Sequence, residues 1–226
     1  MRNYGVFDIL GPVMIGPSSS HTAGAARLGK VAALIAGGNI IEVKFLLHGS
    51  FAKTYRGHGT DRALVAGILG MDPWDERLRD SLSIAKEKDI KVEFVEADLG
   101  DEHPNTVKLI MRKKDGSSAE VMGSSIGGGN IVITEVDGEK IKFTGEYPTL
   151  IIKHIDVPGV ISKVTALLFE EAINIGTMSV YRSSKGCEAT MIFETDSRVE
   201  ERLIDKISQI NHIKSMRVIN PIAERQ

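Results

Sequence analysis

The sequence contains very little cysteine. Cys187 is the single cysteine among 226 residues. One cysteine excludes an internal disulfide, and it excludes a zinc or iron–sulfur site held only by cysteines of this chain. Any iron–sulfur chemistry would need a partner that supplies the thiolates. Because Cys187 alternates with Ala189, Met191 and Phe193 at the start of a predicted strand, we expect its thiol to be buried and structural.

An excess of charge of one sign is also missing. The 28 Lys and Arg residues nearly balance the 30 Asp and Glu residues, for a formal net charge of -2. Nucleic-acid binders normally carry a basic excess or stripe, so the balance argues against that class. Nor is there a run of about 18 apolar residues, so we expect no membrane span. The start, MRNYGVFDIL, has too short an apolar run for a signal peptide, and the expected compartment is the cytoplasm.

What is present is the composition of a soluble globular protein, with 42% apolar and 26% charged residues. The length suits one large domain or two modest ones. The pattern of elements restarts after Glu146-Tyr147-Pro148. We therefore expect two domains, residues 1–147 and residues 148–226.

The first domain reads as α+β, with helices first and strands afterwards. An apolar stripe of Leu28, Val31, Ala32 and Ile35 predicts a helix over about 23–36, which ends at Gly37-Gly38. The other predictions are a strand or loop at 4–15, a strand at 39–48, a polar loop at 56–61, helices at 61–69 and 75–88, alternating strands around 90–94 and 107–111, and a hairpin of about 129–136 and 139–145.

The second domain has the order βαββαβ, which is the ferredoxin-like arrangement. Its predicted strands are 149–155, 173–182, 187–195 and 213–219, and its predicted helices are 160–172 and 198–210.

Four polar segments of the first domain, predicted as loops at helix starts or between strands, carry hydroxyls or glycines, and the first three also contain a histidine. They are Ser18-Ser19-Ser20-His21-Thr22, His58-Gly59-Thr60-Asp61, His103-Pro104-Asn105-Thr106 and Ser124-Ser125-Ile126-Gly127-Gly128-Gly129-Asn130. Histidine titrates near neutral pH, hydroxyls and N–H groups at a helix start hold anions, and glycines let backbone approach a ligand closely. The pattern indicates a small-anion site. Each segment also has a plainer interpretation: a serine cap, a solvated histidine, a glycine turn.

Several better-known sites are excluded. The Gly-x-Ser-x-Gly elbow of serine hydrolases, the phosphate-binding loop of nucleotide hydrolases and the His-Glu-x-x-His zinc motif do not occur. The triple glycine lacks the strand–turn–helix context of a dinucleotide fingerprint. His48, His154 and His212 are interpreted first as structural.

Taken together, the four segments resemble the β part of iron–sulfur-dependent bacterial L-serine dehydratase. The resemblance rests on Gly16-Pro17-Ser18-Ser19-Ser20-His21-Thr22-Ala23-Gly24, on Gly57-His58-Gly59-Thr60-Asp61, on His103-Pro104-Asn105 and on Ser125-Ile126-Gly127-Gly128-Gly129. Residues 148–226, with Asp156-Val157-Pro158-Gly159-Val160-Ile161 before the first helix, resemble an ACT regulatory domain. The whole chain is thus similar to the β chain of the two-chain enzyme.

The resemblance implies a reaction and a partner. The family converts L-serine to pyruvate and ammonia with a [4Fe–4S] cluster on the α subunit, where iron acts as a Lewis acid on the serine hydroxyl while a base takes the α-proton. The lone cysteine agrees, because the ligands must come from α and none from this chain. The first domain also resembles the allosteric substrate-binding domain of some phosphoglycerate dehydrogenases. A non-catalytic serine-sensing module, or a scaffold that only stabilises α, are therefore the alternatives.

Carried onto this sequence, the resemblance gives His58 as the leading general base and His21 as its closest rival. The serine carboxylate would be bound, or groups around the cluster oriented, by the first segment. The substrate-binding candidates are Ser18, Ser19, Ser20, Thr22, Thr60, His103, Asn105 and Ser125.

The ACT resemblance implies self-association and an amino-acid effector in the loop between the first strand and the first helix. The effector-binding candidates are His154, Asp156, Val157, Pro158, Gly159, Val160 and Asn174. Asp156 departs from the amide of the serine-binding relatives. Its carboxylate could repel the ligand carboxylate or pair with its ammonium, and Pro158-Gly159 could instead merely shape a turn.

Overall fold

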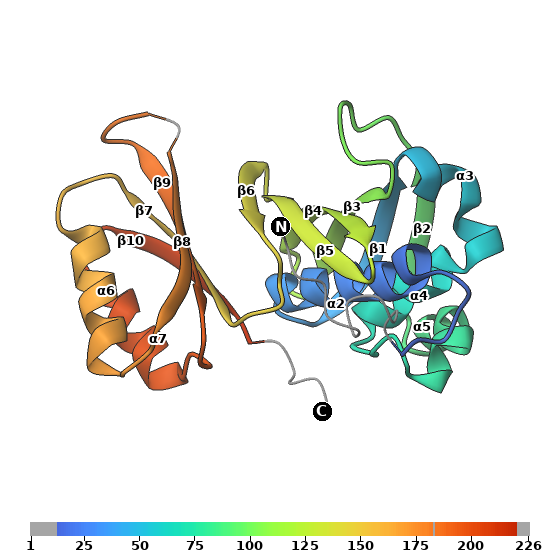
Figure 1. The fold of residues 1–226 in the computed structure, drawn as a ribbon, viewed down its shortest axis with the longest axis horizontal. Coiled ribbons are helices and arrows are strands. Elements are labelled where there is room, and N and C mark those ends of the chain that lie inside the picture. The colour runs from blue at the N-terminus through green and yellow to red at the C-terminus, as the bar shows by residue number, and fades with distance from the viewer. Residues whose placement is uncertain (1–12, 183, 221–226) are drawn as a thin grey trace, which may run out of the picture. The chain divides into compact units, whose positions relative to one another are not determined.

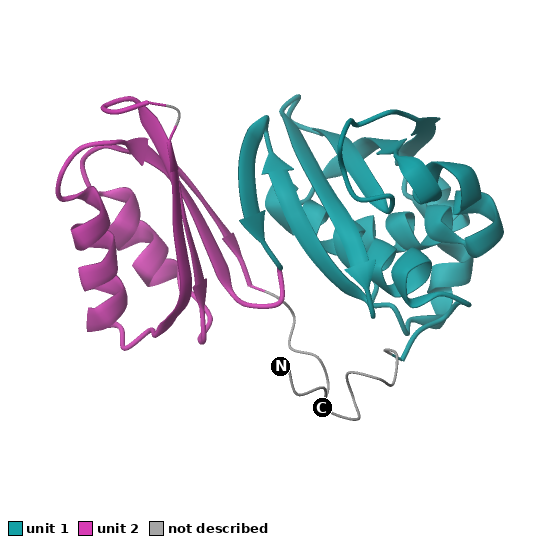
Figure 2. Ribbon diagram, turned by 45° about the horizontal axis from the view of Figure 1, so that its top comes forward, with its two compact units in different colours: residues 1–144 teal, residues 145–226 magenta. Residues whose placement is uncertain are grey.

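The computed structural model describes residues 13–182 and 184–220. The chain divides into two compact units, residues 1–144 and 145–226 (Figure 2). The division falls next to the boundary expected at Tyr147-Pro148. Within the described residues, no helix is long and apolar enough to cross a membrane.

The first unit is a mixed α and β domain around a single six-stranded sheet. Its helical elements are the π-helical turn η1 (Ser19–Gly24), α2 (Ala25–Ala36), α3 (Gly49–His58), α4 (Thr60–Ile68), the 3-10 turn η2 (Glu76–Asp80) and α5 (Ser81–Glu87). Its strands are β1 (Ile40–Leu47), β2 (Lys91–Glu96), β3 (Thr106–Lys113), β4 (Ser118–Gly127), β5 (Asn130–Val136) and β6 (Glu139–Phe143). The sheet order is β2-β1-β3-β4-β5-β6, in which β1 and β2 are parallel and the other neighbours antiparallel.

The core of the first unit forms where α2 and α4 pack together and α2 covers β4 (Figure 1). The predicted stripe of α2 is buried, and Val43, Phe45 and Leu47 of β1 are fully buried, as their alternation predicts. The two helices meet at Gly29 and Gly67, where a Cβ atom would collide with the backbone of the facing helix. Small residues therefore set how closely these helices approach.

Two sequence predictions for the first unit are wrong. Residues 56–61 are not a polar loop, because α3 runs through His58 and only Gly59, with φ of 70°, separates it from α4. Ser124-Ser125 do not lie in a loop either, because β4 extends to Gly127. Of the segment 4–15, which was predicted as a strand or loop, residues 4–12 lie outside the described residues and 13–15 form no strand.

The second unit has the predicted ferredoxin-like fold. Its strands are β7 (Thr149–Ile155), β8 (Ile175–Arg182), β9 (Glu188–Thr195) and β10 (Ile213–Ile219), and its helices are α6 (Val160–Glu170) and α7 (Glu201–Ser208). The antiparallel sheet has the order β10-β7-β9-β8. The apolar faces of both helices pack on the sheet, with Val164, Leu168, Leu203 and Ile207 at most 1% exposed. The α+β prediction is confirmed.

The prediction that the Cys187 thiol is buried is wrong. The strand β9 begins at Glu188, and Cys187 lies before it in a turn where its N–H donates to the Ser184 carbonyl. The thiol is exposed and free. The alternation that predicted burial starts two residues later, at Ala189.

Candidate active site

The serine-rich segment forms a π-helical turn that leads directly into α2. Ser18 stands before η1 in extended conformation, and its Oγ accepts the His21 backbone N–H at 3.3 Å. The plain prediction of a serine cap is therefore confirmed for Ser18. Turns of this wider kind are rare, and they occur often at functional sites.

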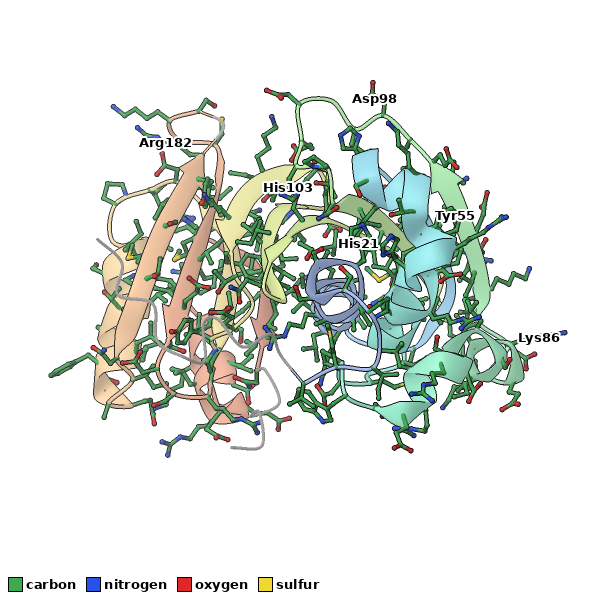
Figure 3. The ribbon with its side chains drawn as sticks, turned by 45° about the vertical axis from the view of Figure 1, so that its right-hand side comes forward. His21, Tyr55, Lys86, Asp98, His103 and Arg182 are labelled. Carbon is green, nitrogen blue, oxygen red and sulfur yellow. The ribbon has the colours of Figure 1, made fainter. Side chains whose placement is uncertain are left out.

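His21, which is labelled in Figure 3, has a hydroxyl partner on each ring nitrogen. Its Nδ1 lies 3.1 Å from Ser20 Oγ and 3.4 Å from Ser18 Oγ, and the two hydroxyls lie 3.3 Å apart. Its Nε2 lies 3.1 Å from Oγ of Ser50, at the start of α3. The imidazole is thus held in one plane from both sides.

His58 packs against this fixed ring. The two imidazole centroids are 4.9 Å apart with an interplanar angle of 35°, and the Phe51 ring contacts His21 edge-on with a centroid distance of 5.3 Å. His58 is exposed, and no hydrogen bond from the described residues reaches its ring. One histidine is therefore fixed, and its neighbour presents unoccupied nitrogens to solvent.

The pKa of His21 lies below its ordinary value. Partial burial is the main cause, and the positive charge of a protonated His58 beside it is the second. Both effects favour a neutral His21 at neutral pH. A neutral imidazole can donate from one nitrogen and accept at the other, which matches its hydroxyl partners.

The segment His103–Thr106 lies against the start of α3. Ser50 N–H donates to the Pro104 carbonyl at 2.7 Å. Gly49, with φ of 56°, approaches so closely that a Cβ atom would lie 2.7 Å from the Pro104 carbonyl oxygen. The exposed His103 accepts the Asn105 N–H on Nδ1 at 3.1 Å. These contacts therefore hold the segment that carries His103 and Asn105 next to Ser50, whose hydroxyl contacts His21.

Ser125 completes the contact between these segments. Its N–H donates to the Asn105 carbonyl at 3.0 Å, and its Oγ lies so close to Gly24 that a Cβ atom there would collide with it. The end of β4 thus lies between η1 and the His103 segment. Only glycine fits at residue 24 with this spacing.

Four buried polar atoms of the first unit lack hydrogen-bond partners within the described part of the chain. They are Thr22 Oγ1, Thr60 Oγ1, Asn105 Oδ1 and Ser125 Oγ. Buried polar groups are nearly always paired, because an unpaired one costs about 1–3 kcal/mol. All four were substrate-binding candidates from the sequence. Asn105 and Ser125 are adjacent, whereas the Thr22 hydroxyl faces Gly16, on another side of the turn.

The structure therefore brings together most of the predicted site. His21, His58, Ser18 and Ser20 form one cluster, and His103, Asn105 and Ser125 adjoin it. Ser19 and Thr60 make no side-chain hydrogen bond to this cluster among the described residues. Sequence reasoning missed Ser50 and Phe51, although a Gly-Ser pair directly after a predicted strand was a signal.

The described residues contain no group of three or more His, Cys, Asp or Glu side chains that could hold a metal ion. The single cysteine lies in the second unit. The donor set of this chain does not fit the ligation of an iron–sulfur cluster, which takes several thiolates.

The predicted effector loop lies between β7 and α6. Asp156 Oδ2 accepts hydrogen bonds from Arg182 at 3.1 Å and from the Gly186 N–H at 3.3 Å. The bond from Arg182 is the main cause of a lowered pKa for Asp156. Its carboxylate is thus already engaged. Val157 and Pro158 follow, and Gly159, with φ of 93°, precedes Val160 at the first turn of α6.

The other two effector candidates lie apart. His154 is buried, donates from Nδ1 to its neighbouring carbonyl of Ile155 at 2.8 Å, and has no partner for Nε2 within the described ranges. Asn174 stands before β8, where it donates to Asp196 at 2.7 Å. The register of β7, β9 and β8 places Asn174 at the opposite end of the sheet from Asp156. Within one domain, Asn174 is not near the loop.

Comparisons with known proteins agree with this organisation. The profile of the serine dehydratase β-chain family matches residues 5–79, and that of the ACT domain matches residues 149–212. A D-3-phosphoglycerate dehydrogenase of Methanocaldococcus jannaschii is 33% identical over 87% of this chain, but the match spans 37% of that protein.

Two relatives match over nearly their whole length. A probable L-serine dehydratase β chain of Bacillus subtilis is 43% identical over 94% of this chain and 96% of its own. The L-serine dehydratase β chain of Peptoniphilus asaccharolyticus is 40% identical over 97% of this chain and 99% of its own. With the matching profile and the histidine and serine cluster in place, the chain belongs to the L-serine dehydratase β-chain family.

Proposed function

We propose that this chain is the β subunit of a cytoplasmic, two-chain L-serine dehydratase that deaminates L-serine to pyruvate and ammonia together with a [4Fe–4S]-bearing α subunit. The observation that supports it best is the His21–His58 pair, in which a hydroxyl-bound neutral ring lies beside an exposed one. Simple capture of a carboxylate needs no second histidine.

The polar groups around the pair match the parts of L-serine. The Ser19 hydroxyl would receive the substrate carboxylate, since hydroxyls and N–H groups at the start of a helix favour an anion, while Ser18 and Ser20 would orient the His21 ring. The unpaired Asn105 Oδ1 is an acceptor and suits the substrate ammonium, and the backbone of Ser125, whose hydroxyl is also unpaired, bonds to the Asn105 carbonyl. Binding would satisfy groups that are otherwise buried without partners.

His58 is the group we assign to the α-proton. Its nitrogens are unoccupied by the described residues, and it lies within reach of solvent. The electron pair of the C–H bond would form the Cα–Cβ double bond while the 3-hydroxyl leaves, and the cluster of the α subunit would supply the Lewis acidity that this leaving group needs. The aminoacrylate tautomerises to the imine, and water converts it to pyruvate and ammonia. In this proposal His21 stays neutral and orients the ring of His58 that packs against it.

The cluster belongs to the partner in this proposal. One exposed cysteine outside the site cannot hold a [4Fe–4S] cluster, so the thiolates would come from the α subunit. We expect the purified chain to contain no iron. Stoichiometric iron and sulfide in the chain alone would refute this assignment.

An anaerobic pull-down from the native cells tests the proposal. The eluate should contain a brown, cysteine-bearing partner and should form pyruvate from L-serine in an oxygen-sensitive reaction. A chain that elutes without activity, after cross-linking has preserved its contacts, contradicts the subunit assignment.

A non-catalytic serine sensor is the second candidate. The observation that favours it is the match to a D-3-phosphoglycerate dehydrogenase, whose name is that of a different reaction. A sensor would bind L-serine as the isolated chain and would leave turnover by any partner independent of His58. Calorimetric titration with L-serine and the His58→Ala variant separate the two.

The second unit would regulate and assemble the enzyme. We propose that a small amino acid such as L-serine binds at Asp156–Val160 beside His154, with the Asp156–Arg182 pair meeting its charged groups. Self-association would use the edge strand β8, where Met178 and Val180 are 41% and 39% exposed. Asn174 would act there only if a second copy brought it to the loop.

A further inference from the structure

Ser50 makes an unusual contact for a serine at the start of a helix. It is the second residue of α3, where serine hydroxyls ordinarily bond to the backbone of their own helix. The Ser50 hydroxyl instead lies 3.1 Å from Nε2 of His21, which is 29 residues away in the sequence. The contact joins the first turn of α3 to η1.

The contacts on the other side of His21 suit a proton on Nε2. Ser18 Oγ accepts the His21 backbone N–H, so its own proton is directed to Ser20 Oγ or to Nδ1. Ser20 Oγ lies 3.1 Å from Nδ1, within reach to donate to it. With Ser18 donating to Ser20 and Ser20 donating to Nδ1, Nδ1 is the acceptor and Nε2–H is left to donate to Ser50.

Ser50 is itself held in place by its backbone. Its N–H donates to the Pro104 carbonyl at 2.7 Å, and the neighbouring Gly49 packs directly on Pro104. The residue therefore connects His21 with the segment that carries His103 and Asn105. A shift of Ser50 would move both sides of the site together.

We propose that Ser50 is a positioning residue of this active site, which accepts the Nε2 proton of His21 and so fixes the tautomer and plane of the ring that His58 packs against. Its catalytic consequence rests on the proposed function, whereas the hydrogen bond is a property of this chain alone. Ser50 acts through His21.

Nitrogen NMR of the histidine side chains tests the hydrogen bond in the full chain at neutral pH. In the wild type, His21 Nε2 should be protonated and Nδ1 unprotonated. Ser50→Ala should give averaged shifts of a tautomer mixture, Ser50→Thr should restore the wild-type pattern, and Thr54→Ala should leave it unchanged. Thr54 is the matched control, because its hydroxyl binds the Ser50 carbonyl and not His21. A proton on Nδ1 in the wild type, or an unchanged spectrum in Ser50→Ala, overturns the proposal.

Kinetics of the reconstituted complex test the consequence. Ser50→Ala should lower kcat about 10- to 100-fold with KM little changed, because a misplaced catalytic group loses its orientation. Ser50→Thr should recover most of that loss. Full turnover by Ser50→Ala would overturn the positioning role. A wild-type complex that is inactive on L-serine would contradict the proposed function instead, and the NMR result would stand by itself.

Discussion

At the scale of single residues, the two histidines of the site differ in what holds them. His21 has hydroxyls on both nitrogens, and His58 has ring contacts but no hydrogen bond from the described residues. A general base must meet its substrate directly and must be free to take a proton. The arrangement favours His58 as the base and His21 as its fixed neighbour.

This difference predicts a linked titration. His58→Ala removes a positive charge beside His21, so the pKa of His21 should rise. It should stay below the ordinary histidine value, because burial, the larger cause, remains. Titration of His21 by NMR in both proteins measures the change, with Lys53→Ala on the exposed side of α3 as the control. A pKa of His21 that falls in His58→Ala would contradict the account.

The sequence predicted most of these residues but not how they meet. Short motifs pointed to His21, His58 and the serines because each pairs a titratable ring with hydroxyls or glycines. For Ser50 the only local signal was the Gly49-Ser50 pair after a strand, and that pair does not show the contact with His21, which is 29 residues away in the sequence. Cys187 was misjudged because alternation is not visible to within one residue at a strand end.

At the scale of elements, close packing of glycine-containing helices shapes the first unit. Gly29 of α2 and Gly67 of α4 each face backbone of the other helix. Since α2 follows η1 directly and α4 follows His58 after Gly59, the spacing of these helices also sets the spacing of the two histidines.

Gly67→Ala should therefore lower the free energy of unfolding by about 1–3 kcal/mol, because its Cβ has no room between the helices. Gly57→Ala is the matched control: it lies within α3 with nothing within 4 Å of its Cβ position, and it should raise that free energy by about 0.5–1 kcal/mol. Urea denaturation of the chain measures both. Equal stability of the two variants would show that the helix contact is not tight.

Two elements, β4 and α3, were not predicted from the sequence. On the buried face of β4, Gly123 lies against Leu28, where a Cβ atom would be 2.7 Å from Leu28 Cδ2. Small residues replace the apolar alternation that reveals a strand, so Ser124-Ser125 resembled a loop. In α3, glycines at both ends and only Phe51 and Ala52 buried leave no clear apolar stripe.

At the scale of the whole molecule, a serine dehydratase β-chain domain and an ACT domain follow one another in a single chain. The order of strands and helices in the second unit was predicted because each carries its own apolar pattern, with a core of Leu150, Ile152, Met191 and Phe193. The apolar pattern does not show what the edge strands of its sheet bind, because that depends on other chains.

The proposed self-association predicts that Met178→Lys weakens dimers formed through β8. A lysine side chain at this apolar edge must lose its hydration when two copies pair. The dissociation constant of the dimer should therefore rise roughly tenfold or more, which corresponds to a loss of about 1.4 kcal/mol in the free energy of association. Ala166→Lys, on an exposed position of α6, is the control and should leave the constant unchanged. Sedimentation equilibrium measures both. Dimers of unchanged strength in Met178→Lys would place the interface elsewhere.

The central claim is that this chain supplies the base to an active site that a cluster-bearing partner completes. The most direct measurement is the rate of pyruvate formation from L-serine by the anaerobically reconstituted pair, with wild-type chain, His58→Ala and Lys53→Ala. We predict that His58→Ala loses about 10²- to 10⁴-fold in kcat/KM while its assembly and cluster content stay those of the wild type, and that Lys53→Ala keeps full activity. Full turnover by His58→Ala, with the complex intact, would contradict the account.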